Sequence, residues 1–168
     1  MKFNDLLFTR RMRQNHALEH ATVTILSQWD PNLSVTARST SDGFIMFGGN
    51  IIDIDLGVLR RGVDEALARL QAGEAELAIH PNCGTNLAVG ISLVTVGTML
   101  GMSSSRTRTR VTSAVVSSLA GMAAARPVGE FVQRHFTTLP DLLGVHVTDI
   151  FRRKLLGFDV IEVRTALE

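Results

Sequence analysis

The middle of the chain is uncharged over a long stretch and apolar over much of it. No Asp, Glu, Lys or Arg occurs between Glu76 and Arg106, a run of 29 residues. Residues 87–102 are apolar apart from three hydroxyl side chains, and a second uncharged run, 111–125, is rich in small residues. At 1.5 Å per residue the two runs make about 24 and 22 Å of helix, short of a bilayer core of about 30 Å unless flanking residues extend them. We expect a helical hairpin that crosses a membrane; the alternative is a buried helix pair in a soluble core or oligomer interface.

The segments on either side of this hairpin have the patterns of helices and strands. Residues 4–28 contain neither Gly nor Pro, which favours a helix. Residues 34–40 and 44–47 flank an Asp-Gly turn signal typical of a β-hairpin. A stripe of apolar side chains over 56–70 predicts a second helix, capped by Asp55 and ended by Gly73. Short strands are predicted at 76–80, around 145–150 and around 160–163.

The fold class predicted from these patterns is α+β, with a small mixed helix/sheet head interrupted by a two-helix apolar hairpin. Residues 1–85 would form the head, and residues 86–126 the hairpin, with a basic loop at 103–110. Residues 127–168 would form a C-terminal β segment that packs back on the head. A chain of 168 residues excludes two large domains.

Composition and charge indicate which classes of binding partner, and which cellular compartment, to expect. The net charge of +1 provides no overall field for nucleic acid, and no glycine-rich phosphate loop is present, so we expect neither nucleic acid nor a nucleotide as partner. Arginines flanking the hairpin are equal in number on its two sides, which leaves orientation open. The absence of a visible signal peptide, the lone cysteine and the larger head favour a cell-membrane protein with both termini in the cytoplasm.

The first candidate for chemistry is the segment NHALEHA at residues 15–21. On the predicted helix, His16, Glu19 and His20 lie on one face. Two imidazoles four residues apart can share a zinc ion, and the carboxylate can take a proton from a bound water, as in the inverted zinc-protease motif. The alternative is that all three are hydrogen-bonded polar residues of a half-buried face.

The second candidate is the segment HPNCGTN at residues 80–86, directly before the apolar run. A Cys83 thiolate at a helix N-terminus would be stabilised by backbone N–H groups and the helix dipole. With His16 and His20 it would give zinc three ligands and an open position, whereas binding by His80 as well would close the site and make it structural. Otherwise Cys83 is a small buried hydrophobe, and His80 bonds the loop backbone.

The two motifs followed by a small-residue apolar hairpin resemble an uncharacterised family of small bacterial membrane proteins. The resemblance continues through residues 127–129, 133–138 and 163–165. A second, more widespread uncharacterised bacterial membrane family is also similar, with an HxxEH and an HPxCGTS segment. The resemblance implies a membrane placement without an established activity, and a shared site at His16, Glu19, His20, His80 and Cys83, with Asn82, Gly84, Thr85 and Asn86 as motif neighbours.

Three functions fit these residues. The first is a membrane-anchored zinc hydrolase of peptide or amide bonds, with His16, His20 and Cys83 on the metal and Glu19 as general base. The second is a non-catalytic module in which His80 completes a structural zinc site and the hairpin assembles with itself or with a membrane partner. The third uses Cys83 as a nucleophile activated by His16 or His20, without a metal.

The loop between the two apolar runs is a further candidate for binding. Arg106, Arg108 and Arg110 stand at alternate positions, which suits contact with anionic headgroups of membrane lipids. A plain solvated loop is the alternative.

Overall fold

The protein consists of two compact units. The computed structural model describes residues 9–103 and 107–168. One unit, the head, contains the described residues up to His80 together with Arg134–Glu168, and the other, the hairpin unit, contains Pro81–Gln133. The predicted fold class is confirmed, because the chain combines helices with an antiparallel sheet and carries two long apolar helices.

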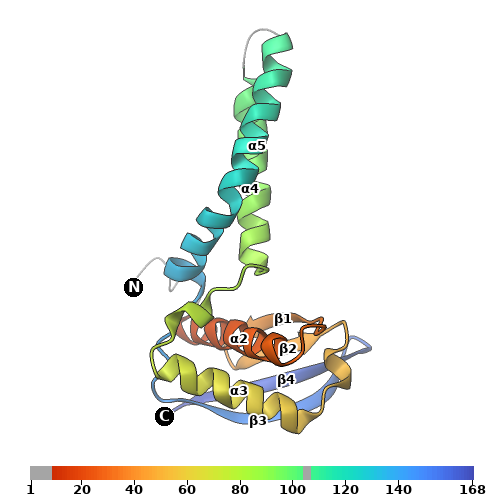
Figure 1. Cartoon of the computed structure of the whole chain (residues 1–168), viewed down its shortest axis with the longest axis vertical. Coiled ribbons are helices and arrows are strands. Elements are labelled where there is room, and N and C mark those ends of the chain that lie inside the picture. Colours follow the sequence, from red (N-terminus) through yellow and green to blue (C-terminus); the bar gives the residue numbers. More distant parts are fainter. Residues whose placement is uncertain (1–8, 104–106) are drawn as a thin grey trace. The chain divides into compact units, whose positions relative to one another are not determined.

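The head is a sheet with helices packed on it (Figure 1). Its described residues form a four-stranded antiparallel sheet in the order β1-β2-β4-β3. Helix α2 packs on β1, β2 and helix α3, and α3 packs on β3. The bounds are α2 Arg10–Trp29, β1 Thr36–Thr40, β2 Gly43–Phe47, α3 Leu56–Gln71, β3 Val145–Leu155 and β4 Phe158–Leu167, with single 3-10 turns η1 at Ile51–Asp53 and η2 at Ala75–Ala78.

The core of the head lies between the helices and one face of the sheet. Phe44 and Met46 of β2 pair with Val163 and Ile161 of β4, and all four side chains are fully buried. Because strand side chains alternate between faces, the intervening Glu162 belongs to the other face of the sheet. The helices cover the buried face with Ala17, Leu18, Ala21, Ile25, Leu59, Val63, Ala66 and Leu70.

The tight turn between β1 and β2 requires a glycine. Gly43 has a φ of +149°, and a Cβ at this position would lie 1.9 Å from the carbonyl oxygen of Val163. Only glycine avoids both the strained backbone and the clash. The β-hairpin predicted from the Asp-Gly signal is therefore confirmed.

Helix α3 also forms as predicted. Asp55 is the N-cap, and its carboxylate accepts the backbone N–H of Val58 at 3.0 Å. Leu59, Val63 and Leu70 of the apolar stripe are buried against the core. The cap and the stripe are local signals, so this helix can be predicted from its own sequence.

The strand predicted at residues 76–80 is wrong, because this segment contains the 3-10 turn η2. The carbonyl of Glu74 accepts the N–H of Leu77, and that of Glu76 accepts the N–H of Ile79, each at 3.1 Å. The Ala78 carbonyl accepts a hydrogen bond from a side chain of α2 rather than from a strand. A short apolar run does not distinguish a strand from a turn of helix, and here local backbone bonds decide.

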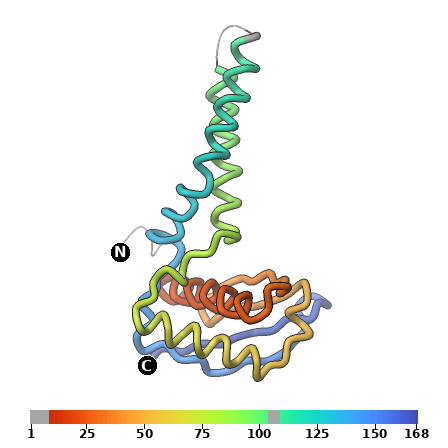
Figure 2. The backbone as a smooth tube through the Cα atoms, in the orientation of Figure 1, coloured from red at the N-terminus to blue at the C-terminus, as the bar shows by residue number. Residues whose placement is uncertain are grey.

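The hairpin unit is built from two closely packed helices, α4 (Gly84–Met102) and α5 (Thr107–Val132) (Figure 2). Glycines allow the backbones to touch: a Cβ on Gly97 would lie 2.5 Å from the carbonyl oxygen of Ser117, and one on Gly101 would lie 2.4 Å from the Cα of Ala114. This is the small-residue packing expected of helices in lipid. α5 also continues through Pro127 and thus extends beyond the uncharged run.

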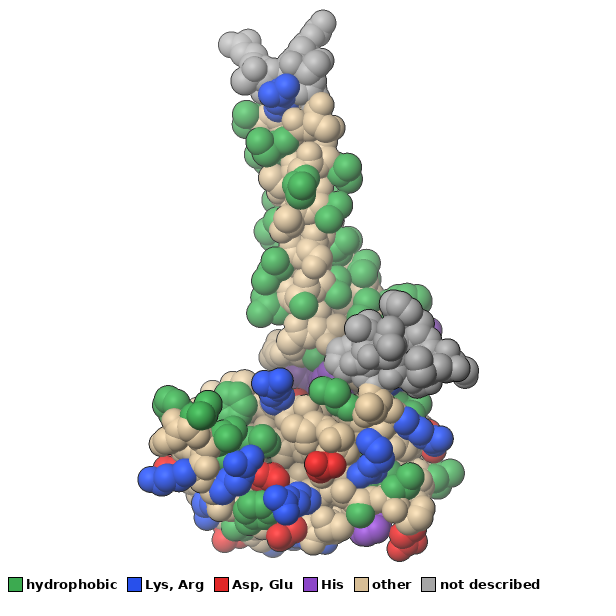
Figure 3. Space-filling model, turned by 180° about the vertical axis from the view of Figure 1, so that it is seen from behind, with side chains coloured by type: hydrophobic (Ala, Val, Ile, Leu, Met, Phe, Trp, Pro, Cys, Tyr) green, Lys and Arg blue, Asp and Glu red, His purple; other side chains and the backbone are tan. Residues whose placement is uncertain are grey.

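Both helices are long enough to cross a bilayer. Their 19 and 26 residues correspond to about 28 and 39 Å at 1.5 Å per residue. On the face shown in Figure 3, charged side chains are spread over the head, whereas the hairpin unit is covered by hydrophobic and uncharged side chains along most of its length, with a basic side chain near its far end. The most exposed large apolar side chains of the two helices are Leu87, Ile91, Met99, Leu100, Met102, Val111, Val116, Leu119 and Met122. The two helices could therefore cross a membrane.

Candidate metal centre

Helix α2 carries the histidine pair of the first motif. The helix begins where Thr9 Oγ1 accepts the N–H of Met12 at 3.2 Å, and it is uninterrupted by Gly or Pro. The ring centroids of His16 and His20 lie 4.3 Å apart, and one ring nitrogen of each lies within 4.8 Å of the other. The spacing of four residues therefore brings the two imidazoles together, as the sequence predicts.

Each histidine of the pair is held by a backbone carbonyl. His16 Nδ1 lies 2.9 Å from the carbonyl oxygen of Thr137, and His20 Nδ1 lies 2.7 Å from that of Ala78. A carbonyl oxygen only accepts hydrogen bonds, so in both rings Nδ1 carries the proton and Nε2 carries the lone pair. Metal-binding histidines in proteins are typically oriented by such a bond from the nitrogen that does not bind the metal.

The pair is uncharged at neutral pH. Burial, together with the neighbouring rings of His16 and His80, lowers the pKa of His20 to about 3, against the opposing effect of the bond to Ala78. Burial also lowers the pKa of His16, partly offset by the bond to Thr137. Both Nε2 lone pairs are therefore free of a proton near pH 7, which binding of a metal ion requires.

Glu19 lies on the buried side of α2 and is held by a serine. Its side chain is 7% exposed, and Ser39 Oγ on β1 donates a hydrogen bond to Glu19 Oε2. Burial raises the pKa of Glu19 to about 7, although the Ser39 bond acts in the opposite direction. A carboxylate with a pKa near neutrality can both take up and release a proton under physiological conditions.

The second motif spans the boundary between the two units. His80 belongs to the head, where its ring centroid lies 5.7 Å from that of His20. Cys83 belongs to the hairpin unit, where it is the N-cap of α4 and its Sγ accepts the N–H of Thr85 at 3.4 Å. Three residues of extended chain span at most about 11 Å, so chain connectivity alone keeps the Cα of Cys83 within that distance of the Cα of His80.

The motif neighbours have different positions. Gly84 is the first residue of α4, and Thr85 follows it in the first turn. Asn86 Nδ2 donates to the carbonyl of Pro81 at 2.8 Å, while Asn82 lies in the turn before the helix. These residues thus build the N-terminal turn that carries Cys83.

The donor types of the candidate set suit zinc. His16, His20 and Cys83 each offer one ligand atom, an imidazole nitrogen or a sulfur. Two nitrogens and one sulfur are ligands that zinc accepts, and three protein ligands leave its fourth position for water or substrate. Glu19, engaged with Ser39, would stay outside such a ligand set and be available for proton transfer.

The predicted lipid-binding loop is only partly described. Arg106 lies outside the described residues, and Arg108 is in the first turn of α5. Arg110 follows on the same helix and is exposed. Contact of these arginines with lipid headgroups stays a prediction.

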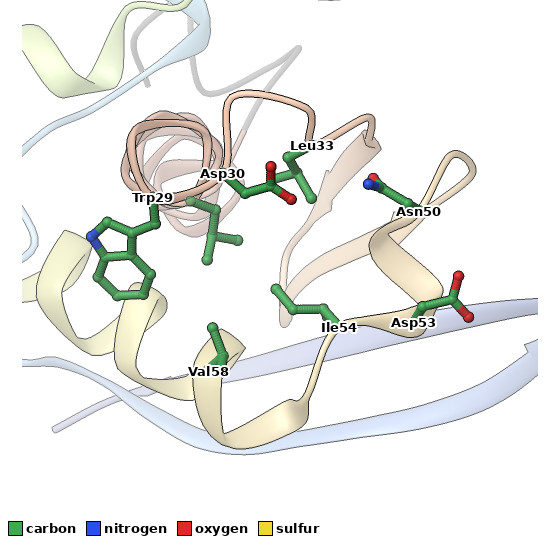
Figure 4. A pocket seen from close by; sticks show the side chains of 8 residues that line it. Trp29, Asp30, Leu33, Asn50, Asp53, Ile54 and Val58 are labelled. Carbon is green, nitrogen blue, oxygen red and sulfur yellow. The ribbon is translucent and has the colours of Figure 1, made fainter.

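A separate hollow of ≈ 380 Å³ lies in the head, between the end of α2 and the start of α3 (Figure 4). Trp29 lies on one side, and Asn50 and Asp53 lie on the other. Its lining contains no residue of either motif, so it is distinct from the candidate metal centre.

Sequence reasoning missed the residues that support the motifs from a distance. Ser39 lies 20 positions from its partner Glu19, and Gln133, which donates to Asn86 Oδ1 at 2.7 Å, lies 47 positions from Asn86. The carbonyls of Ala78 and Thr137 could come from any residue type, so the sequence carries no signal for them. Only the stretch 133–138, noted for its resemblance to the family, contains two of these partners, Gln133 and Thr137.

The fold and these residues define a class of protein: an α+β head with a carbonyl-anchored histidine pair, interrupted by a two-helix apolar hairpin. The chain belongs to the family described as "Domain of unknown function (DUF6391)", whose model matches residues 11–150. It is also 36% identical over 146 residues to an uncharacterized protein of Picosynechococcus sp., covering 80% of this chain and 67% of that protein. No solved structure matches the chain. Membership of an uncharacterised family is thereby confirmed.

Proposed function

We propose that the chain is a membrane-anchored, zinc-dependent hydrolase that acts on a peptide or amide bond. His16 and His20 would bind the metal through Nε2, and Cys83 would be the third protein ligand. The observation that carries this proposal is the pair of Nδ1–H bonds to backbone carbonyls, which orients two neutral imidazoles on one helix face. Such anchoring is typical of histidines that bind a metal.

Cys83 is the best candidate within the chain for the third zinc ligand. It follows His80 by three residues, and His80 lies beside His20 in the head. Cys83 is the N-cap of α4, where the helix dipole and the N–H of Thr85 would favour its thiolate form. Both influences favour the deprotonated sulfur that zinc requires.

Glu19 would be the general base. The hydrogen bond from Ser39 fixes one of its carboxylate oxygens, so the side chain is oriented before substrate arrives. The second oxygen, Oε1, would take a proton from the attacking water and deliver it to the leaving amine. When bound, zinc would polarise the substrate carbonyl and lower the pKa of water.

The hairpin unit would anchor this head in the cell membrane, with the head in the cytoplasm. The exposed apolar side chains along α4 and α5 support contact with lipid tails, since an apolar surface of this extent is unusual in water. Self-association through the same helices, or binding to a membrane partner, is part of the proposal.

A structural zinc site is the second candidate, and the position of His80 favours it. With its ring centroid 5.7 Å from that of His20, His80 is near enough for a modest rearrangement to make it a fourth ligand. Four protein ligands would leave no open position for a substrate, and the zinc would then only join the head to the N-terminal turn of α4.

The test is the zinc content of the detergent-purified full chain, measured by elemental mass spectrometry. We expect one zinc per chain in the wild type and none in His20→Ala or Cys83→Ser. His146→Ala, which removes an exposed imidazole on β3, is the matched control and should keep its zinc. A wild type that holds no zinc after purification without chelator, and takes up none when zinc is added, refutes both candidates.

Two further variants separate the hydrolase from the structural module. If the protein is a hydrolase, His80→Ala keeps its zinc, and the wild type cleaves a fluorogenic peptide library. Glu19→Gln then also keeps its zinc but does not cleave the library. In the structural module, His80→Ala loses zinc, while neither the wild type nor Glu19→Gln cleaves peptides.

A further inference from the structure

One side chain joins the two ends of the hairpin unit. Asn86 Nδ2 donates to the carbonyl of Pro81 at 2.8 Å, and Asn86 Oδ1 accepts from Gln133 Nε2 at 2.7 Å. Pro81 is the first residue of the hairpin unit and Gln133 is the last. The side-chain amide of Asn86 therefore forms hydrogen bonds with both the first and the last residue of the hairpin unit.

The fit around this amide is tight. Gln133 is fully buried, and a Cβ on Gly129 would lie 2.2 Å from Asn86 Oδ1. Glycine at position 129 is thus what allows α5 to approach the Asn86 side chain. An aspartate at position 86 would lose the donor to Pro81, and an alanine would lose both this bond and the acceptor for Gln133 Nε2.

The same amide closes the turn that carries Cys83. The carbonyl of Cys83 accepts the backbone N–H of Asn86 at 2.9 Å, and the Asn86 side chain reaches back to Pro81 on the other side of the cysteine. Cys83 is thereby enclosed in a short loop fixed at both ends. Its Sγ accepts the N–H of Thr85 within this loop.

We infer that Asn86 and Gln133 are positioning residues that hold the Cys83 thiolate in place for metal binding, with Gly129 making room for them. The inference rests on the proposed function, in which Cys83 is a ligand. Replacing a residue that orients a metal ligand from outside the ligand set typically lowers metal affinity by about 10–100-fold.

The first experiment measures cobalt binding by the full chain in detergent, using the thiolate-to-cobalt charge-transfer band as the signal. We expect Asn86→Ala and Gln133→Ala each to weaken cobalt affinity by about 10–100-fold and to change the band. Because Asn86→Ala already removes the hydrogen bond with Gln133 as well as the one to Pro81, the double variant should be little worse than Asn86→Ala alone. Ser92→Ala, which removes an exposed hydroxyl bonded only within α4, is the control and should match the wild type.

Gly129→Ala tests positioning without removing any polar group. It leaves both amides in the chain but places a methyl group where Asn86 Oδ1 lies, so cobalt affinity should fall as it does in Asn86→Ala. Wild-type affinity and an unchanged band in Asn86→Ala, Gln133→Ala and Gly129→Ala would overturn the inference.

A second measurement needs no metal. Cys83 is the single thiol of the chain, so its alkylation rate in chelator at one pH reports directly on the turn. We expect alkylation to be severalfold faster in the three variants than in the wild type and Ser92→Ala. Failure of the wild type to bind cobalt would count against the proposed function, whereas equal alkylation rates in all variants would count against the role of Asn86 and Gln133.

Discussion

Replacing Glu19 with glutamine should make the metal-free protein more stable at alkaline pH. The carboxyl group is buried, and its pKa is raised from 4.5 to about 7 in the folded chain. In the unfolded chain the group ionises first, so the folded state holds a proton that the unfolded state has released. The free energy of unfolding must therefore fall as the pH rises from 4.5 through 7.

The magnitude follows from the difference between the two pKa values. At about 1.4 kcal/mol for each pH unit, a pKa raised from 4.5 to about 7 corresponds to about 3 kcal/mol. Most of this loss falls between pH 5 and pH 8. Glutamine keeps an acceptor for the Ser39 hydroxyl but never ionises. The free energy of unfolding of Glu19→Gln should therefore rise relative to that of the wild type by roughly 2 to 3 kcal/mol over this interval.

The assay is urea unfolding of the full chain in detergent with a chelator, at pH values from 5 to 8.5. Trp29, the single tryptophan, is the last residue of α2, so its fluorescence reports on the helix that carries Glu19. Glu65→Gln, which removes a half-exposed carboxylate from α3, controls for the loss of a surface charge. If the wild-type and Glu19→Gln curves run parallel across this range, the native carboxyl group ionises as in water and the reasoning is refuted.

Two further predictions concern packing within each unit. Asn15 is fully buried, donates to the carbonyls at positions 40 and 41 and accepts a hydrogen bond from Thr165. Asn15→Ala should therefore lower the free energy of unfolding by about 2 to 4 kcal/mol in the same urea assay. A loss below about 0.5 kcal/mol would contradict this prediction. In the hairpin unit, Gly97→Ala should lower the thermal midpoint of helix loss, measured by circular dichroism in detergent, because the added Cβ would meet backbone at 2.5 Å. Gly90→Ala, which would meet only the Ala125 side chain at 3.3 Å, should change the midpoint far less, and equal midpoints in the two variants would disprove the close packing.

The parts of the fold that the sequence predicts are those with local causes. The Asp55 cap and the apolar stripe after it define α3, and the strain at Gly43 defines the turn between β1 and β2. The turn η2 could not be predicted, since its four residues are too few to show a period. Whether such a run forms a strand depends on a partner strand far away in the sequence.

In the candidate site, too, the features with local causes could be predicted from the sequence, and those that depend on tertiary packing could not. The spacing of His16 and His20 on a helix places both side chains on one face, and their ring centroids lie 4.3 Å apart. Ser39 and Gln133 reach their partners only through tertiary packing, and the carbonyls that orient the two histidines belong to residues of no special type. The sequence therefore predicts the groups that would carry the chemistry but not the groups that hold them.

The position of β4 within the sheet bears on how the protein is made. β4 lies between β2 and β3, yet it is the last strand of the described chain, and the whole hairpin unit is synthesised before it. Until β4 arrives, Phe44 and Met46 on β2 lack the partners that bury them. The apolar helices thus leave the ribosome while the head is still half a sheet with an open edge. In the membrane-anchored protein proposed above, the hairpin would thus be available for insertion before β4 completes the sheet of the head.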